Sequence, residues 1–191
     1  MARRLGMIAV VALAVGLGGF GLIRLAGAGA TEFRLEGAVL HVAGPLNGAA
    51  ADRMQRLFEE HPGLEVVALG DLPGADDVVW AAGMGRLIRA AGLETRAVGP
   101  VVNDAILLYL GGVRRVVEGG ALVLHSDAVQ RQRGIAVDAS VAAQADRQQF
   151  VAAMLGDGRF ADFMAATRAA RESYQLTAED MARFGLQTQA Q

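Results

Sequence analysis

Short apolar runs alternate with longer stretches of helical spacing from Gly37 onward. This alternation is typical of βαβ units, and it predicts an α/β domain built around a mainly parallel sheet. Each expected strand is short and rich in Val or Leu, as in strands that are covered on both faces. These strands are 38–42, 64–69, 95–98 and 121–125.

Helices are predicted in the gaps between these strands. Asn47 is a suitable N-cap for the first helix, and Gly92 is well placed to end the second. The second helix carries an apolar stripe that we expect to pack in the core rather than bind a ligand, made of Trp80, Met84, Leu87, Ile88 and Ala91. The stretch 105–110 is apolar all round, which predicts a central helix that is buried on every side.

The chain after His125 changes from polar to helical. The polar stretch 126–134 predicts an exposed loop, and a helical segment through Leu155 is expected to follow it. Near the C-terminus, Thr177 and Asp180 have the spacing of a capping box at the start of a last helix.

The first 30 residues predict an export signal. Two arginines precede an apolar run over 5–23, and small residues follow it over 26–30. The length of the run favours a transmembrane anchor, whereas the Ala-x-Ala triplets fit a cleaved signal peptide, and both interpretations stay open. In either case Arg3 and Arg4, opposed more weakly by Arg24, favour a cytoplasmic N-terminus, so the domain 31–191 is expected outside the cytoplasm, at the cell membrane or in the periplasm.

Composition excludes several classes of function. Charges of both signs are spread along the chain with a net charge of −2, so a nucleic-acid partner is not expected. The chain has no cysteine, which removes a thiolate nucleophile and Cys-type metal sites. Because His41, His61 and His125 do not have the spacing of a metal site, neither a metal nor a cofactor is predicted.

Five segments share a pattern with known proteins in their order and spacing. They are a strand and Pro-Gly turn over 66–75, a helix and strand over 85–95, a turn, apolar helix and Gly-x-Arg corner over 101–115, a strand over 121–125, and a closing helix over 176–186. Together they resemble the Clp protease/crotonase-like (ClpP-like) superfamily, especially its exported bacterial members. The resemblance implies a βαβ superhelix, preceded here by the N-terminal apolar helix, and homo-oligomers.

The departures from that superfamily concern its catalytic residues. Asn103 stands where the family has its serine nucleophile, and an amide is not a useful hydrolytic nucleophile. Ser173 stands near the position of the family's aspartate, with Glu172 as the neighbouring carboxylate, while the resemblance retains His125 as the histidine. The family-equivalent catalytic positions are thus Asn103, Asp104 and His125, and we predict that they are inactive.

The resemblance also implies where an oxyanion hole would lie. Its backbone N–H donors would come from the turn at Gly74 and Ala75 and from Asp104. A carboxylate of Asp104 within about 4 Å of a developing oxyanion would repel it by roughly 1–4 kcal/mol, which opposes acyl-transfer chemistry.

Structural explanations compete with these roles. Asn103 and Asp104 are favoured as N-caps of the buried helix. Asp76 and Asp77 could bind a cation but are favoured as a solvated helix start. His125 is favoured as a relic of the catalytic histidine, the alternatives being the polar end of a strand or an acid/base that pairs with Asp104 or Asp127.

Three functions follow in order of preference. The first is a non-catalytic domain, tethered to the cytoplasmic membrane, that binds a peptide or protein ligand or assembles with further copies. The second is an extracytoplasmic peptidase or hydrolase that uses His125 to activate water. The third is crotonase-type acyl-CoA chemistry, which is disfavoured because coenzyme A thioesters are not expected outside the cytoplasm.

Overall fold

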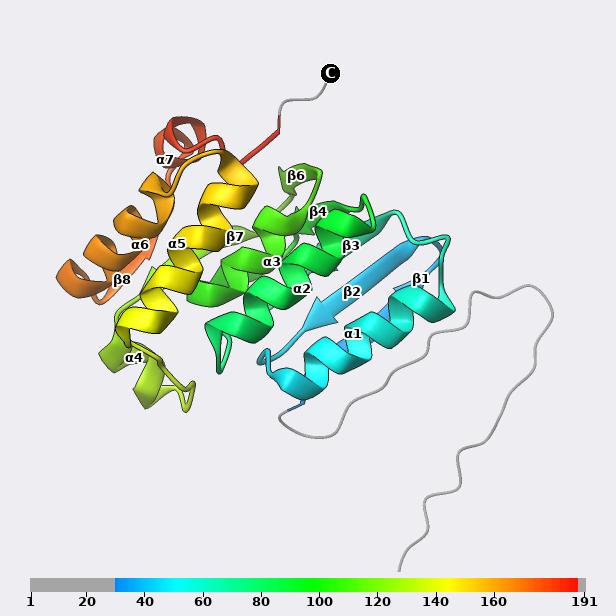
Figure 1. Cartoon of the computed structure of the whole chain (residues 1–191), viewed down its shortest axis with the longest axis horizontal. Helices are drawn as coiled ribbons and strands as arrows, with labels where there is room; N and C mark the ends of the chain where they lie inside the picture. The colour runs from blue at the N-terminus through cyan, green and yellow to red at the C-terminus, as the bar shows by residue number, and fades with distance from the viewer. Residues whose placement is uncertain (1–29, 189–191) are drawn as a thin grey trace, which may run out of the picture.

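Eight strands form two sheets in residues 30–188, the part of the chain that the computed structural model describes (Figure 1). The larger sheet has the order β1-β2-β3-β4-β6, and the smaller has the order β5-β7-β8. Their bounds are β1 (Glu32–Glu36), β2 (Val39–Ala43), β3 (Val66–Leu69), β4 (Glu94–Ala97), β5 (Pro100–Val102), β6 (Arg114–Val117), β7 (Ala121–His125) and β8 (Ser173–Gln175).

The pairing in both sheets is mainly parallel, as predicted. Strands β2, β3, β4 and β6 run parallel, and β5 runs parallel to β7. The antiparallel strands are β1, at the edge beside β2, and β8, at the edge beside β7. The four expected strands are present as β2, β3, β4 and β7, with ends that differ by at most two residues.

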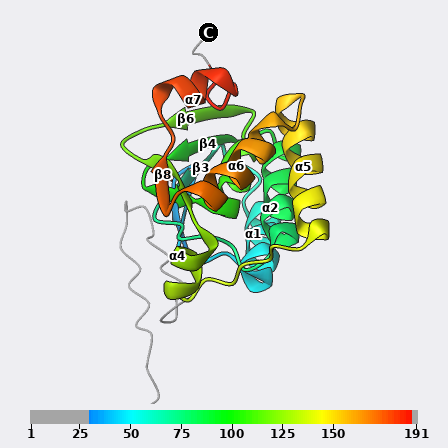
Figure 2. The same ribbon diagram turned by 90° about the vertical axis from the view of Figure 1, so that its left-hand side faces the viewer.

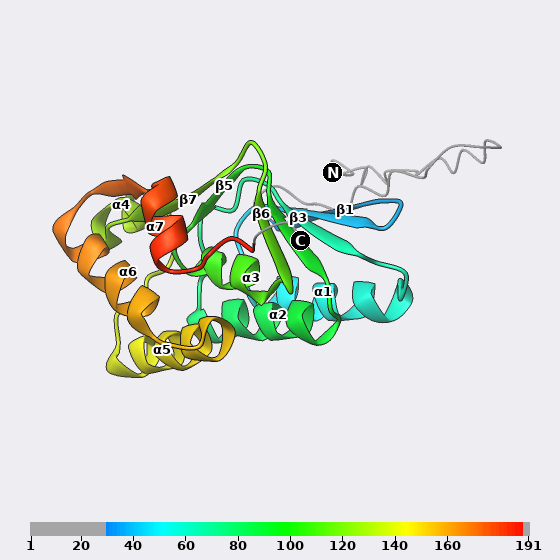
Figure 3. The same cartoon turned by 90° about the horizontal axis from the view of Figure 1, so that it is seen from above.

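Seven α-helices accompany these strands within the described residues, six of them before the last strand and α7 after it. They are α1 (Gly48–Glu60), α2 (Val78–Ala90), α3 (Ile106–Gly111), α4 (Asp127–Gln132), α5 (Val141–Leu155), α6 (Arg159–Ala170) and α7 (Ala178–Arg183). Helices α1 and α2 lie on one side of the five-stranded sheet (Figure 3). Helix α5 packs against α2 and α3 and forms an outer layer (Figure 2).

Local capping signals place three helix starts. Asn47 accepts a hydrogen bond from the Ala50 amide at 3.0 Å and so begins α1. Asp77 caps α2, and Thr177 forms a capping box with Asp180 at the start of α7. These features confirm the capping predictions for α1 and α7, because each cap satisfies an amide that has no partner inside its helix.

Helix α3 is the centre of the fold, as its apolar sequence predicts. All six of its residues are buried, between α2, α5 and the strands. Close packing with α2 depends on two glycines: a Cβ atom at Gly85 would lie 2.6 Å from the Leu107 carbonyl, and one at Gly111 would overlap the Gly85 carbonyl. Backbones can approach so closely only where neither helix carries a side chain.

Two sequence predictions about single segments are wrong. Trp80 is 44% exposed and packs over Gly48, because it lies beside the buried face of α2. The stretch 126–134 is not simply an exposed loop: it contains α4, whose Gln130 is 1% exposed and donates to the Pro73 carbonyl.

The predicted apolar helix of the first 30 residues falls almost wholly outside the described residues. Within residues 30–188, none of the helices is long and apolar enough to cross a membrane.

Candidate functional site

Asn103 extends the strand pairing of the smaller sheet with its side chain. Its amide nitrogen donates to the His125 carbonyl at 3.0 Å, and its amide oxygen accepts from the His125 N–H at 2.9 Å. The backbone leaves the sheet at Asn103, with a φ of +49°, a value that Asn tolerates better than most residues. The side-chain amide thus takes the place that a peptide group would have had beside β7.

The prediction that Asn103 and Asp104 cap the buried helix is therefore wrong. Neither the 3₁₀ turn over Asn103–Ala105 nor α3 has a side-chain cap. Asn103 is held by β7, and Asp104 is held by a side chain of α5, because both residues are buried where long-range partners are close.

Asp104 forms a two-bond ion pair with Arg147 of α5. The Nε and Nη2 atoms of Arg147 donate to the two carboxylate oxygens at 2.6 and 2.9 Å, and Nη1 donates to Gln144 at 2.8 Å. Burial opposes the charge of Arg147, but hydrogen bonds and the charge of Asp104 outweigh it, so the pKa of Arg147 is raised above its usual value. The carboxylate of Asp104 is thus engaged by a cation rather than by His125.

A second arginine, Arg168 of α6, completes this cluster. Its Nη2 donates to Asp127 at 2.6 Å, and its Nη1 lies 3.9 Å from Asp104. The two arginines therefore bind both of the carboxylates that were considered as partners of His125, those of Asp104 and Asp127. Neither carboxylate is shown to orient the imidazole.

The backbone donors of the expected oxyanion hole are covered. Gly74, Ala75, Asn103 and Asp104 border a space of only about 10 Å³, which Gln130 and Ile135 fill from the other side. A Cβ atom at Gly74 would lie 3.0 Å from Ile135, which shows how closely that side chain approaches the turn. Such a space holds about one water molecule and leaves no room for an acyl group.

His125 ends β7 as a buried and sparsely bonded imidazole. The residue is 7% exposed, and its Nδ1 has no hydrogen-bond partner among the described residues. Burial lowers its pKa, and the charge of Arg133 lowers it further, while a backbone interaction with Glu172 opposes them. The imidazole is therefore neutral near pH 7 and lacks a carboxylate to hold a proton on it.

The lowered pKa of His125 predicts that the domain loses stability in acid. The unfolded chain protonates this histidine near pH 6.5, before the folded chain does, so its contribution is complete above that pH and is lost as the pH falls through and below it. Between about pH 7.5 and about pH 5.5, we expect the free energy of unfolding, measured with urea, to fall more for the wild type than for His125→Gln. Equal losses in the two proteins would contradict this.

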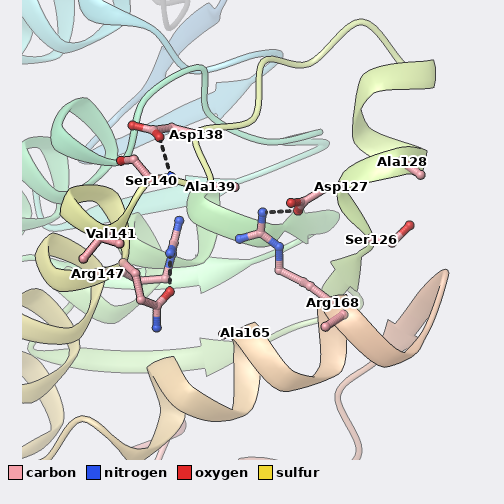
Figure 4. A pocket seen from close by; sticks show the side chains of 12 residues that line it. Ser126, Asp127, Ala128, Asp138, Ala139, Ser140, Val141, Arg147, Ala165 and Arg168 are labelled. Atoms are coloured by element: carbon pink, nitrogen blue, oxygen red, sulfur yellow. Dashed lines mark hydrogen bonds and ion pairs between the residues drawn. The ribbon is translucent and has the colours of Figure 1, made fainter.

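An open cavity lies next to the covered hole (Figure 4). It has a volume of about 640 Å³ and lies between α4, α6 and the start of α5. Its charged lining residues are Asp127, Asp138, Arg147 and Arg168. Among residues 30–188 there is no cluster of three His, Asp or Glu side chains arranged to hold a metal ion.

Comparison with solved structures identifies the fold. ClpP1 from Listeria monocytogenes matches with a TM-score of 0.58 at 12% identity, covering 78% of this chain and 88% of that one. An enoyl-CoA hydratase from Mycobacterium avium subsp. paratuberculosis K-10 matches with a TM-score of 0.53 at 22% identity, covering 86% and 69%. This chain has the ClpP/crotonase-like fold. No protein-family model and no curated protein matches its sequence.

A third ClpP/crotonase-like structure is a mutant of a membrane-bound stomatin-specific protease. It matches with a TM-score of 0.53 at 13% identity, covering 78% of this chain and 76% of that one. The prediction of a ClpP/crotonase-like fold is thus confirmed for the domain, whereas the predicted apolar helix before it lies almost wholly outside the described residues.

Two residues of the candidate site, Arg147 and Arg168, were missed by sequence reasoning. A signal for the first was present: Ala143, Arg147, Phe150 and Val151 lie at the spacing of one buried helix face, so a charge interrupts an apolar stripe. A buried charge needs a partner, and this pattern indicated that one existed without saying where.

Proposed function

We propose that this protein is a non-catalytic ClpP/crotonase-like domain that binds a ligand, and that the ligand is a peptide or a protein segment. One observation carries the proposal: at the position of the family's nucleophile, both hydrogen-bonding groups of Asn103 are used to hold the backbone of His125. The residue thus has a structural role in this place and no chemical one.

The surroundings of Asn103 support the same proposal. The covered hole leaves no space for a reacting acyl group, and Asp104 and Asp127 are paired with arginines. A hydrolytic water would need a base with a matched pKa and an oriented imidazole. Within residues 30–188, the Nδ1 atom of His125 has no hydrogen-bond partner that could orient the imidazole, and burial lowers its pKa.

The test is a turnover assay on peptide, ester and acyl-thioester substrates. We expect no turnover by the wild type, by His125→Ala or by Asn103→Ser, because a serine at position 103 would still face the space that Gln130 and Ile135 fill. Turnover by the wild type that His125→Ala abolishes would replace this proposal with a hydrolase. Turnover confined to thioesters would favour acyl-CoA chemistry.

Membrane tethering is the second part of the proposal. It is supported by the apolar run over 5–23, flanked by arginines, which has the length of a membrane span. The full chain is expected in the membrane fraction, where a protease added outside the cytoplasmic membrane can cleave it. A chain starting at Thr31 is expected neither in the membrane fraction nor within reach of that protease. Release of a shortened chain into the periplasm would instead indicate a cleaved signal peptide.

Assembly with further copies is the third part, and the fold supports it, since the superfamily forms oligomers. The measurement is sedimentation of the domain from Thr31 onward. If the domain stays monomeric at high concentration, assembly with further copies is contradicted.

A further inference from the structure

The cavity beside the covered hole has the size and lining of a small-ligand site. Its volume of about 640 Å³ falls in the range of typical ligand pockets. Small apolar side chains form much of its wall, namely Ala128, Ala139, Val141, Ala165 and Ala169. Such walls leave room for an apolar chain, while a few polar groups remain to orient it.

The two arginines that line the cavity differ in how well carboxylates neutralise their charges. The two cations that line the cavity, Arg147 and Arg168, are both buried, with side chains 4% and 10% exposed. The buried carboxylate of Asp104 binds Arg147 with two bonds, so Arg168 is left mainly with Asp127. Because the side chain of Asp127 is 34% exposed, the charge that balances Arg168 lies at the mouth, where a ligand can compete with it.

Arg168 also has unused hydrogen-bonding capacity. Its Nε is buried and has no partner among the described residues, and Asp127 contacts Nη2 through one oxygen. The same edge of Arg147, by contrast, is filled by both oxygens of Asp104. Figure 4 shows Arg168 reaching across the cavity toward Asp127, with Arg147 on the opposite wall. This edge of Arg168, which Asp127 uses with only one oxygen, has the fork geometry that matches a carboxylate.

We propose that this cavity binds a terminal carboxylate carried on an apolar chain, and that the carboxylate takes the place of Asp127 on Arg168. The inference rests on the proposed function, in which the domain binds a peptide without cleaving it. The ligand would then be a peptide C-terminus, with its last side chains against the alanines of the wall. Asp138, at the mouth, accepts a hydrogen bond from the Ser140 amide and is exposed, so water and salt screen its repulsion of an incoming carboxylate.

The experiment measures binding of matched probes to the domain from Thr31 onward. The probes are two pools of N-acetylated tetrapeptides with Ala, Val, Leu and Phe mixed at the last two positions, one pool ending in a carboxylate and the other in a carboxamide, and octanoate as a carboxylate without peptide groups. A hydrogen bond to a charged group contributes about 1.5–3 kcal/mol, so the acid pool should bind at least about tenfold more tightly than the amide pool.

Three variants separate recognition from folding. Arg168→Gln should bring the ratio of acid to amide affinity close to one, and Asp127→Asn should tighten the acid pool because it removes the internal competitor. Arg171→Gln is the matched control: Arg171 directly follows the last residue of α6 but is stacked on Tyr174, so this variant should bind as the wild type does. Asp127→Asn keeps the inference testable if Arg168→Gln fails to fold.

Each outcome decides the question. Equal binding of the two pools, or a ratio that Arg168→Gln leaves unchanged, would overturn the inference while leaving a peptide-binding domain. Binding of octanoate without the peptide acids would keep the carboxylate site and remove the peptide from the proposed function. Failure of every probe to bind would overturn the inference, whereas the turnover assay decides separately whether the domain is catalytic.

Discussion

Replacing Arg147 with methionine is expected to lower the free energy of unfolding by about 3–5 kcal/mol, the cost of leaving a buried charge without its partner. Asp104 would lose both of its bonds to Arg147, and Arg168 could replace them only partly from its distance of 3.9 Å. Urea unfolding of the domain from Thr31 onward measures the change.

The control for this prediction is an exposed ion pair in the same domain. Arg159 and Asp157 pair with side chains that are 69% and 48% exposed, so Arg159→Met should change stability by less than about 1 kcal/mol. Adding Asp104→Asn to Arg147→Met should recover part of the loss, because the uncompensated carboxylate is removed. A loss of less than about 1 kcal/mol in Arg147→Met would show that the pair is open to solvent.

Gly111→Ala is expected to destabilise the domain by about 3 kcal/mol, since the added methyl group meets backbone that cannot rotate away. The contact is with the Gly85 carbonyl and Cα of α2, the latter 2.8 Å from the ideal Cβ position. To admit the methyl group, α3 must move away from α2, and the buried packing around α3 loosens with it.

A glycine in the middle of α2 provides the matched control. A Cβ atom at Gly83 would meet nothing within 4 Å, so Gly83→Ala should stabilise the domain by about 0.5–1 kcal/mol through the better helix propensity of alanine. If both substitutions had the same effect, the close approach of the two helices would not be what position 111 requires.

The elements of the fold were largely predictable because their signals are local. The run 105–110 is apolar on all sides, and a helix with that pattern must be buried whatever surrounds it. Likewise, Asn47 and the pair Thr177 and Asp180 act within one turn of their own helices. Four strands were missed, namely β1, β5, β6 and β8. Of these, β5 and β8 are only three residues long, and both pair with β7, which lies between them.

The candidate site was only half predictable for the same reason. The sequence pointed to Asn103, Asp104 and His125, but the local rule that makes Asn and Asp good caps gave the wrong partners for the first two. Asn103 bonds to a strand 22 residues away, and Asp104 to a helix 43 residues away. Capping rules carry no information about contacts of that range.

The sequence by itself determined the class of fold, since hydrophobic periodicity is a property of the chain alone. Only the tertiary structure decided which charges meet, that Gln130 and Ile135 cover the hole beside Gly74, and that an open cavity remains next to it. The physical reason is that burial removes water as a partner, so each buried polar group must bond with whatever group the fold brings near.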